Sequence, residues 1–261
     1  MRMTARLALF GTSIALVATA TGATAAQAED GGSGNITIDK VVVNGGKPVV
    51  VGTTDTVYAK VTVTASDDSG IKENTYISAF GPTPNYDQIW FDEDEITCAE
   101  VSATTSTCTG TLTFDPQGGS AINGNTAAAT WRISTLVSAH DFDFIHRDAA
   151  TTFKVQRASK LTVNASPEPV KKGKAITVTG KLSRANWETG KYAGYTNQSV
   201  KLQFRKKGSS TYTTVKTIKS NSTGELKTTV TASTDGYFRY SFAGTATTPA
   251  VSATGDYVDV Q

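Results

Sequence analysis

Five aspartates lie at two breaks in the strand pattern of the chain's first half. Asp67 and Asp68 share one turn, and Asp141, Asp143 and Asp148 surround a second. Hard cations such as Ca²⁺ bind several carboxylate and carbonyl oxygens. If the two turns are the B–C and F–G loops of one β-sandwich, they meet at the same end, and all five carboxylates could hold calcium. The alternative is that Asp-Ser-Gly and Asp-x-Asp are turn sequences that face water.

A second candidate surface combines basic and aromatic residues of the chain's second half. Outside a bacterial cell, a cationic face attracts anionic polymers such as teichoic acids and peptidoglycan carboxylates. Aromatic rings in a polar loop can stack on a glycan or on a side chain of another surface protein. The predicted ligand-binding residues are Trp187, Lys191, Tyr192, Tyr195, Arg205, Lys206 and Lys207. Two alternatives remain, because the basic half could simply complement an acidic half and the rings could cover a small core. No nucleic-acid recognition motif accompanies the basic residues.

The sequence contains two cysteines, Cys98 and Cys108, in a segment that alternates as a hairpin with its turn near residues 102–105. Pairing 98 with 108 places the cysteines directly opposite each other, at a Cα separation that a disulfide can bridge. Redox-active pairs more usually have the spacing Cys-x-x-Cys. We therefore predict a structural disulfide.

The motifs that would indicate an enzyme are missing. The sequence has no Gly-x-Ser-x-Gly, no His-Glu-x-x-His and no phosphate-binding glycine motif. Its only histidines are His140 and His146, which lie too far apart along a straight strand to share one metal ion. We expect a protein that is not an enzyme and has no cofactor other than Ca²⁺.

The elements that must position these residues are short β-strands. Apolar residues alternate with polar ones, as Val61 and Val63 do with Thr62 and Thr64, and Gly, Asn, Asp and Pro clusters separate the runs. This pattern is typical of antiparallel sheets with one face in water. Seven or eight strands in the first half and seven in the second predict an all-β fold of two tandem immunoglobulin-like sandwiches.

Charge divides the chain in the same way. Residues 29–156 carry 7 Lys and Arg against 17 Asp and Glu, a net charge of −10, whereas residues 157–261 carry 16 against 6, a net charge of +10. We expect an acidic domain with the disulfide over 29–156 and a basic domain over 157–261. The stretch 157–170 contains Pro167 and Pro169, which resist a central sheet position, and we place the joint between the domains in this stretch.

Residues 1–28 have the parts of a signal peptide. Arg2 and Arg6 precede a short apolar run, and small residues lead to Ala26-Gln27-Ala28, which fits a cleavage site. The apolar run is too short to span a bilayer. We therefore expect a secreted, extracellular protein with no transmembrane segment after cleavage.

Three stretches of the second half resemble the bacterial Ig-like modules of secreted actinobacterial proteins. They are Ala-Ser-Pro-Glu-Pro-Val-Lys-Lys-Gly, Ser-Val-Lys-Leu-Gln-Phe-Arg-Lys-Lys-Gly and Thr-Asp-Gly-Tyr-Phe-Arg-Tyr-Ser-Phe-Ala-Gly. The first half is similar to the Ig-like domain that often precedes them, through Val-Asn-Gly-Gly-Lys and Thr-Ala-Ser-Asp-Asp-Ser-Gly-Ile. Some members of this family are labelled calcium-binding, and the resemblance supplies no catalytic residue. The resemblance implies a secreted protein of this type. From the charged and aromatic surfaces described above we expect an extracellular or cell-envelope binding or adhesion module, or alternatively a structural spacer in a surface assembly.

Overall fold

The structure is a computed structural model that describes residues 30–83, 87–91, 95–118 and 122–261. The predicted signal peptide, residues 1–28, lies outside the described residues. The first domain contains β1 (Gly31–Ser33), β2 (Thr37–Val43), η1 (Asn44–Gly46), β3 (Val49–Val51), β4 (Val57–Ser66), β5 (Tyr76–Phe80), β6 (Gln88–Trp90), β7 (Thr97–Ser102), β8 (Thr105–Phe114), η3 (Asn125–Ala127), β9 (Thr130–Ser138) and β10 (Phe144–Arg157). The second domain contains β11 (Ser159–Leu161), β12 (Asn164–Ser166), β13 (Ala175–Asn186), β14 (Lys191–Gly194), β15 (Ser199–Lys206), β16 (Thr213–Lys219), β17 (Glu225–Thr231), β18 (Gly236–Phe242), β19 (Val251–Ser252) and β20 (Asp256–Val258).

The first domain is an immunoglobulin-like sandwich. One sheet has the order β2-β4-β8-β7, and the other has the order β1-β10-β9-β5-β6, with β3 added in parallel to β10. The first order corresponds to strands A, B, E and D of an Ig domain, and β10, β9 and β5 correspond to G, F and C. The predicted all-β, Ig-like fold is confirmed. The strand β1 was not predicted, because its sequence Gly-Gly-Ser has no alternating pattern.

Aromatic residues form the centre of this first core. The ring of Trp131 lies 5.4 Å from Phe114 and 6.2 Å from Phe153, measured between centroids. Its indole Nε1 donates a hydrogen bond of 2.8 Å to the carbonyl of Ala127, so the one polar atom of the buried ring has a partner. Trp131 lies on β9, so this central core residue belongs to the sheet that also contains β10.

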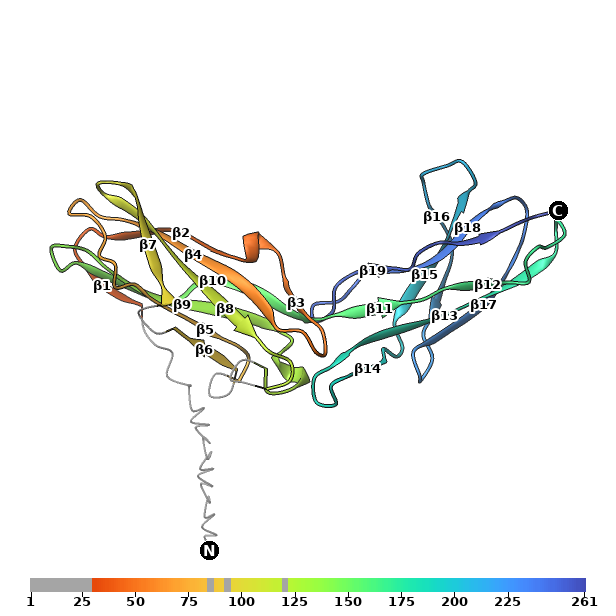
Figure 1. The fold of residues 1–261 in the computed structure, drawn as a ribbon, viewed down its shortest axis with the longest axis horizontal. Helices are drawn as coiled ribbons and strands as arrows, with labels where there is room; N and C mark the ends of the chain where they lie inside the picture. The colour runs from red at the N-terminus through yellow and green to blue at the C-terminus, as the bar shows by residue number, and fades with distance from the viewer. Residues whose placement is uncertain (1–29, 84–86, 92–94, 119–121) are drawn as a thin grey trace, which may run out of the picture.

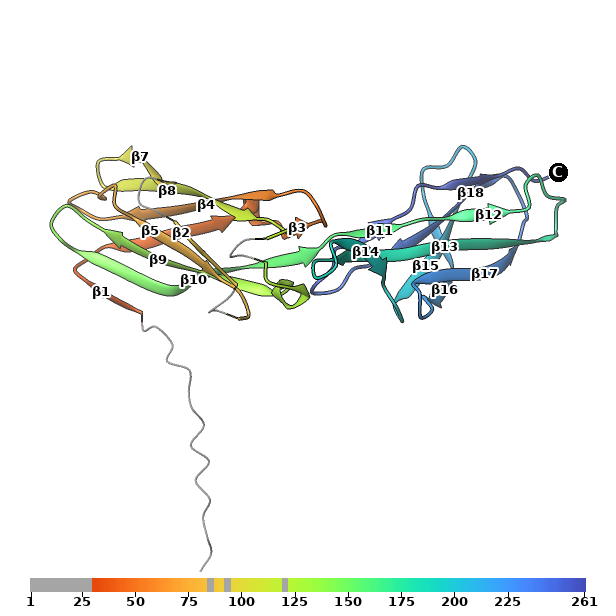
Figure 2. The same ribbon diagram turned by 60° about the horizontal axis from the view of Figure 1, so that its bottom comes forward.

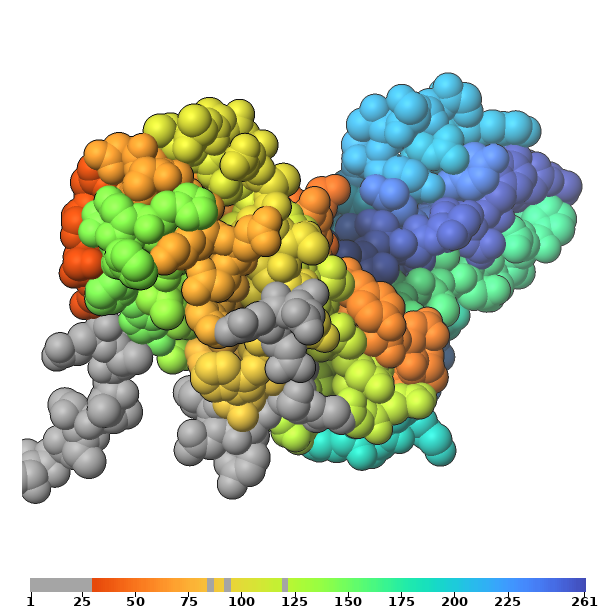
Figure 3. Space-filling view, turned by 60° about the vertical axis from the view of Figure 1, so that its left-hand side comes forward, coloured from red at the N-terminus to blue at the C-terminus, as the bar shows by residue number. Residues whose placement is uncertain are grey.

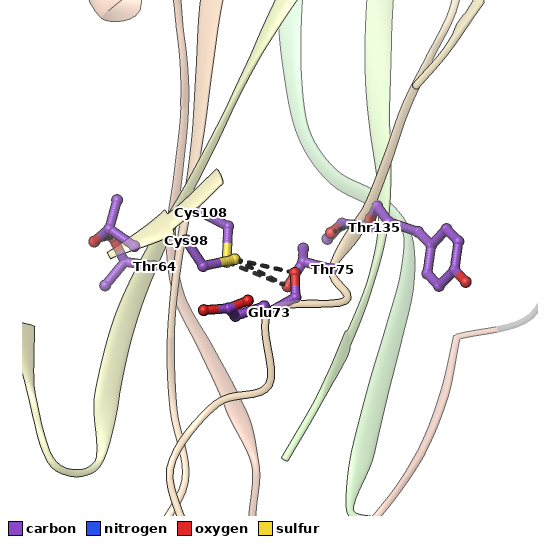
Figure 4. Close-up of a disulfide and its surroundings, with 8 residues drawn as sticks. Thr64, Glu73, Thr75, Cys98, Cys108 and Thr135 are labelled. Atoms are coloured by element: carbon purple, nitrogen blue, oxygen red, sulfur yellow. Dashed lines mark hydrogen bonds between the residues drawn. A yellow bond between two sulfur atoms is a disulfide. The ribbon is translucent and has the colours of Figure 1, made fainter. Parts of the chain in front are cut away.

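The predicted disulfide is confirmed (Figure 4). Cys98 on β7 lies directly opposite Cys108 on β8, with 3.9 Å between their Cα atoms. The hydroxyl of Thr75 lies 3.2 Å from Sγ of Cys108, and it must be the donor because a disulfide sulfur carries no hydrogen. Thr75 is buried just before β5, so the disulfide links the β7–β8 hairpin and also contacts the opposite sheet.

The second domain is another sandwich of two five-stranded sheets. One contains β11, β12, β13, β14 and β17, and the other contains β15, β16, β18, β19 and β20. Tyr240 of β18 is fully buried and donates a hydrogen bond of 2.9 Å to the carbonyl of Val178 on β13. Burial raises the pKa of this phenol to about 12, so Tyr240 stays neutral and joins the two sheets as a hydrogen-bond donor.

The two domains lie end to end, and β10 leads almost directly into β11 (Figures 1 and 2). Arg157, the last residue of β10, is buried and donates from Nε to the carbonyl of Ala185 in the second domain. Burial, with a smaller contribution from Arg184, lowers the pKa of Arg157 to about 10. Gln156 donates hydrogen bonds of 3.1 Å to the carbonyls of Thr245 and Ala246. Hydrogen bonds from side chains to backbone carbonyls thus form part of the junction between the domains.

Candidate functional site

The aspartate turns of the first domain meet at its outer end. In Figure 3 the orange segment with the β4–β5 turn and the green segment between β9 and β10 lie side by side. The backbone N–H of His140 donates to the carbonyl of Gly70 over 3.1 Å, and that of Asp141 donates to Oγ of Ser69 over 3.2 Å. One carboxylate oxygen each from Asp67, Asp68 and Asp141 lies within 4.8 Å of the others. We call these three residues the acidic tip.

The other two predicted aspartates have different partners. Oδ2 of Asp143 accepts a hydrogen bond of 2.9 Å from the backbone of Asn35, next to β1. Asp148 lies inside β10, and Arg132 of β9 holds it by hydrogen bonds of 3.0 and 3.2 Å. The prediction that all five carboxylates converge is therefore wrong. The pairing of β1 with β10 and the register shift between Arg147 and Thr151 of β10 set these two positions. Neither feature is visible in the local sequence.

The aromatic loop predicted to bind a ligand is instead a hairpin that contacts the other domain. Trp187 follows β13, is 7% exposed and belongs to the hydrophobic core of the first domain. Its Nε1 donates a hydrogen bond of 2.8 Å to the carbonyl of Gly52, and its backbone N–H donates to Oδ1 of Asn125 over 3.0 Å. A ring in this position cannot also stack on a ligand at the surface.

The remaining predicted residues of that hairpin differ in their surroundings. Tyr192 packs against the first core, with Nζ of Lys160 3.8 Å from its ring centre. Tyr195 packs against Phe242, and the guanidinium of Arg184 lies 4.0 Å from its ring centre. Lys191 is exposed. The two tyrosines thus serve packing at and near the junction, in agreement with the alternative that these rings cover a core.

The basic residues of the second domain take part in a row of cations and tyrosines. The row lies on the outward face of the sheet formed by β15, β16, β18 and β20, shown in Figure 1. The guanidinium of Arg239 lies 3.8 Å from the ring centre of Tyr212, and that of Arg205 lies 4.1 Å from the ring centre of Tyr237. The rings of Tyr237 and Tyr257 are 5.2 Å apart. We call Arg205, Lys207, Tyr212, Tyr237, Arg239 and Tyr257 the Arg–Tyr strip.

One hydrogen bond holds each guanidinium group of the strip, and the other N–H groups of each arginine remain available as donors. Nε of Arg239 donates to Oε1 of Gln203 over 2.9 Å, and Nη1 of Arg205 donates to the carbonyl of Ser209 over 2.6 Å. Within the described residues, neither arginine forms an ion pair. Each guanidinium is therefore fixed in position, and its remaining N–H donors can take an anion.

Arg205 and Lys207 of the strip were predicted, and Lys206 beside them is exposed at the end of β15. The three tyrosines of the strip and the contact of Arg239 with Tyr212 were missed. Tyr237 and Arg239 are on the face of β18 opposite the buried Phe238 and Tyr240. The period-2 alternation contained this signal, but pairing with Tyr212 and Tyr257 depends on strand neighbours.

One end of the strip is a chain of polar contacts. Lys207 Nζ donates to the hydroxyl of Tyr257 over 3.1 Å, and that hydroxyl donates to Oδ2 of Asp235 over 3.1 Å. Oδ1 of Asp235 accepts a 2.9 Å hydrogen bond from the backbone of Val260. This last bond is the largest of the effects that lower the pKa of Asp235, followed by those of Tyr257 and Lys207.

The lowered pKa of Asp235 makes the stability of the second domain depend on pH. A carboxylate with a depressed folded-state pKa stabilises the fold above its ordinary pKa and loses this contribution as the pH falls through the folded value. We expect Asp235→Asn to lower the urea midpoint at pH 7 and to differ less from the wild type at pH 3. A difference that grows on acidification would contradict this assignment.

A further exposed aromatic lies on the first domain. Trp90 of β6 is 63% exposed, and its ring meets that of Phe80 edge-on at 5.1 Å. No sequence pattern singled it out, because a tryptophan near a strand end is equally compatible with core and surface. Trp90 is therefore a surface ring that packs against Phe80 on one side and is open to solvent elsewhere.

Together these features define a class: a two-domain, Ig-like β-sandwich protein with charged surfaces at separate places. Among the described residues, no helix has the length and apolar character needed to cross a membrane. No protein-family model matches the chain. None of the curated proteins matches it either.

Solved structures with a similar arrangement show low sequence identity and low TM-scores. A DUF4785 family protein from Legionella pneumophila has 13% identity and a TM-score of 0.35, with 77% of this chain and 51% of that chain covered. The D00-D0 domain of intimin has 14% identity and a TM-score of 0.28, with 84% and 99% covered. The adhesin InvE of Yersinia pseudotuberculosis has 16% identity and a TM-score of 0.27, with 84% and 58% covered. This chain therefore spans about half the length of the first of these proteins and somewhat more of the third.

Proposed function

We propose that this protein is a secreted, non-catalytic binding module of the cell exterior or envelope. Its second domain holds an anionic polymer on the Arg–Tyr strip. The observation that carries the proposal is the pair Arg205 and Arg239, each stacked on a tyrosine and fixed by one hydrogen bond, with donors left over. Such a pair is pre-organised, so little side-chain entropy is lost when it binds an anion.

The ligand class follows from charge and shape. The strip lies on a domain with a net charge of +10, which attracts a polyanion over longer distances. Both arginines lie near the same ring, Tyr212, at 3.8 and 5.3 Å, so they present neighbouring donors. A polymer with repeated phosphate or carboxylate groups, such as a wall teichoic acid, can bind both neighbouring guanidinium groups at once, and so fits them better than a single small anion does.

The test is co-sedimentation of the mature chain, residues 29–261, with purified cell walls that contain teichoic acid. We expect binding that 0.5 M salt reverses, because surface charge interactions are screened. Arg205→Ala with Arg239→Ala should lower the binding constant at least about tenfold, since hydrogen bonds to charged groups contribute about 1.5–3 kcal/mol each. A circular dichroism melt checks that this variant folds.

The matched control removes the same charge from the opposite sheet. Lys181 of β13 and Lys227 of β17 are both exposed, and Lys181→Ala with Lys227→Ala should retain most of the binding. If this control loses as much as the arginine variant, general charge rather than the strip is responsible. Unchanged binding by a folded arginine variant would overturn the role of the strip.

The second candidate function is a structural spacer, and the junction favours it. The two domains are joined by hydrogen bonds from the side chains of Gln156, Arg157 and Trp187 and by the burial of the Trp187 ring. Such contacts limit hinge motion, which suits a protein that sets a distance between its ends. A spacer predicts no sedimentation with cell walls by the wild-type chain under any salt condition.

A further inference from the structure

Asp67 is a buried carboxylate with an unused oxygen. Its side chain is at the start of the turn after β4 and only 4% of the residue is exposed. Oδ1 accepts hydrogen bonds from the backbone N–H and the hydroxyl of Ser69, over 2.8 and 2.6 Å. Oδ2 has no hydrogen-bond partner among the described residues. A buried carboxylate oxygen without a donor is costly, and in a native structure it calls for a partner such as an ion.

The surroundings of this oxygen are acidic. Asp68 and Asp141 are exposed, and one carboxylate oxygen of each lies within 4.8 Å of one of Asp67. None of the three forms an ion pair within the described part of the chain. Lys72 extends to the same loop, but its Nζ lies 4.2 Å from the ring centre of Phe142. Three carboxylates thus face one another, and no cation of the described residues is paired with them.

Two loops are already held at the positions that this arrangement needs. The backbone of Asp67 donates to Thr104 in the β7–β8 turn over 2.8 Å, and His140 donates to Gly70 over 3.1 Å. Oδ1 of Asp141 accepts from the backbone of Asp143 over 3.1 Å. Because backbone contacts set the loops, the carboxylates stay close although they repel one another.

We propose that the acidic tip binds one Ca²⁺ ion through Asp67, Asp68 and Asp141. The three ligands are hard oxygen donors, and two of them are exposed, so water can complete the six to eight positions that Ca²⁺ takes. Mg²⁺ fits less well because it demands near-ideal octahedral geometry and dehydrates reluctantly. The ion neutralises the mutual repulsion and links the β4–β5 turn to the β9–β10 turn. The site is on the first domain and the Arg–Tyr strip is on the second, so a failure of one proposal would leave the other unaffected.

The experiment is a thermal melt of residues 29–261 after EDTA treatment, with and without 10 mM CaCl₂, followed by calorimetric titration with Ca²⁺. Extracellular calcium modules bind with dissociation constants of about 10⁻⁴–10⁻³ M. Binding to the folded state alone should therefore raise the melting temperature by about 3 °C or more. Asp68→Asn with Asp141→Asn should abolish the shift and the heat of binding. The same variant should melt no lower than the wild type without calcium, because it removes like-charge repulsion.

The matched control is Asp143→Asn in the same loop. Asp143 lies outside the acidic tip and accepts from Asn35, so this variant should keep the full calcium shift. Three results would overturn the proposal: no shift and no heat with the wild type at 10 mM, a shift retained by the double variant, or an equal shift with Mg²⁺. If the double variant failed to fold, Asp68→Asn alone would serve, with weaker calcium binding as the expected result.

Discussion

Trp187→Ala should lower the free energy of unfolding by about 3–5 kcal/mol, the range for truncating a large buried aromatic. Trp187 belongs to the second domain by sequence, but its ring is buried in the first core and its Nε1 donates to Gly52. Its removal leaves a void and an unpaired carbonyl between the domains. Urea unfolding followed by circular dichroism measures the loss, and X-ray scattering should show a wider spread of interdomain arrangements.

Trp90→Ala is the matched control for this prediction. It removes the same side chain from a position that is 63% exposed, and we expect a loss below about 1 kcal/mol. The scattering profile should not change, since Trp90 contacts Phe80 within the first domain. Equal losses in the two variants would mean that burial between the domains contributes nothing measurable.

Gly194→Ala should destabilise the second domain by about 3 kcal/mol, the upper end of the range for overpacking. A Cβ atom on Gly194 would lie 2.0 Å from the carbonyl oxygen of Thr223 and 2.4 Å from its carbon. Both are backbone atoms of a turn that cannot easily move. Oδ1 of Asn221 accepts hydrogen bonds from the backbone N–H groups of Thr223 and Glu225, and Gly224 accepts one from Leu182. The shift in thermal and urea midpoints gives the loss.

Gly190→Ala in the same hairpin separates crowding from backbone conformation. Gly190 has a φ of 63°, and no atom lies within 4 Å of the position that a Cβ would take there. Alanine at this position therefore costs only the left-handed backbone, about 1–2 kcal/mol. If Gly190→Ala proved as damaging as Gly194→Ala, the close approach to Thr223 would not be the cause.

Local alternation was sufficient to predict the sandwiches and the disulfide, and the standard loop arrangement of an Ig domain predicted that the two aspartate turns meet. In β4, Ala59, Val61 and Val63 are buried while Lys60 is exposed, so the period-2 pattern fixes which face packs. Cys98 and Cys108 could be paired because a hairpin sets its own register. These features depend on residues near one another in sequence or on the standard loop arrangement of an Ig domain.

Contacts between distant segments could not be predicted in the same way. Asp143 is bound by Asn35 and Trp187 by Gly52, at separations of 108 and 135 residues. Nothing in the sequence around Trp187 distinguishes a ring that packs on its own domain from one that packs on its neighbour. Only part of the Arg–Tyr strip was predicted. Arg205 and Lys207 stand out in the sequence as a basic cluster. By contrast, Tyr237 and Tyr257 lie on segments far from that cluster in the sequence.

The parallel pairing of β3 with β10 has a mechanical consequence. Val49, Val50 and Val51 pair with Val155, Gln156 and Arg157, and in the second domain Val170 pairs in parallel with Val260. In both domains an early segment therefore runs beside the final one in the same direction. A pull on the two chain ends would slide these segments past each other, so that their hydrogen bonds resist together instead of opening one after another. Forced unfolding is governed by the rate of this opening, and we expect the protein to sustain tension along its length.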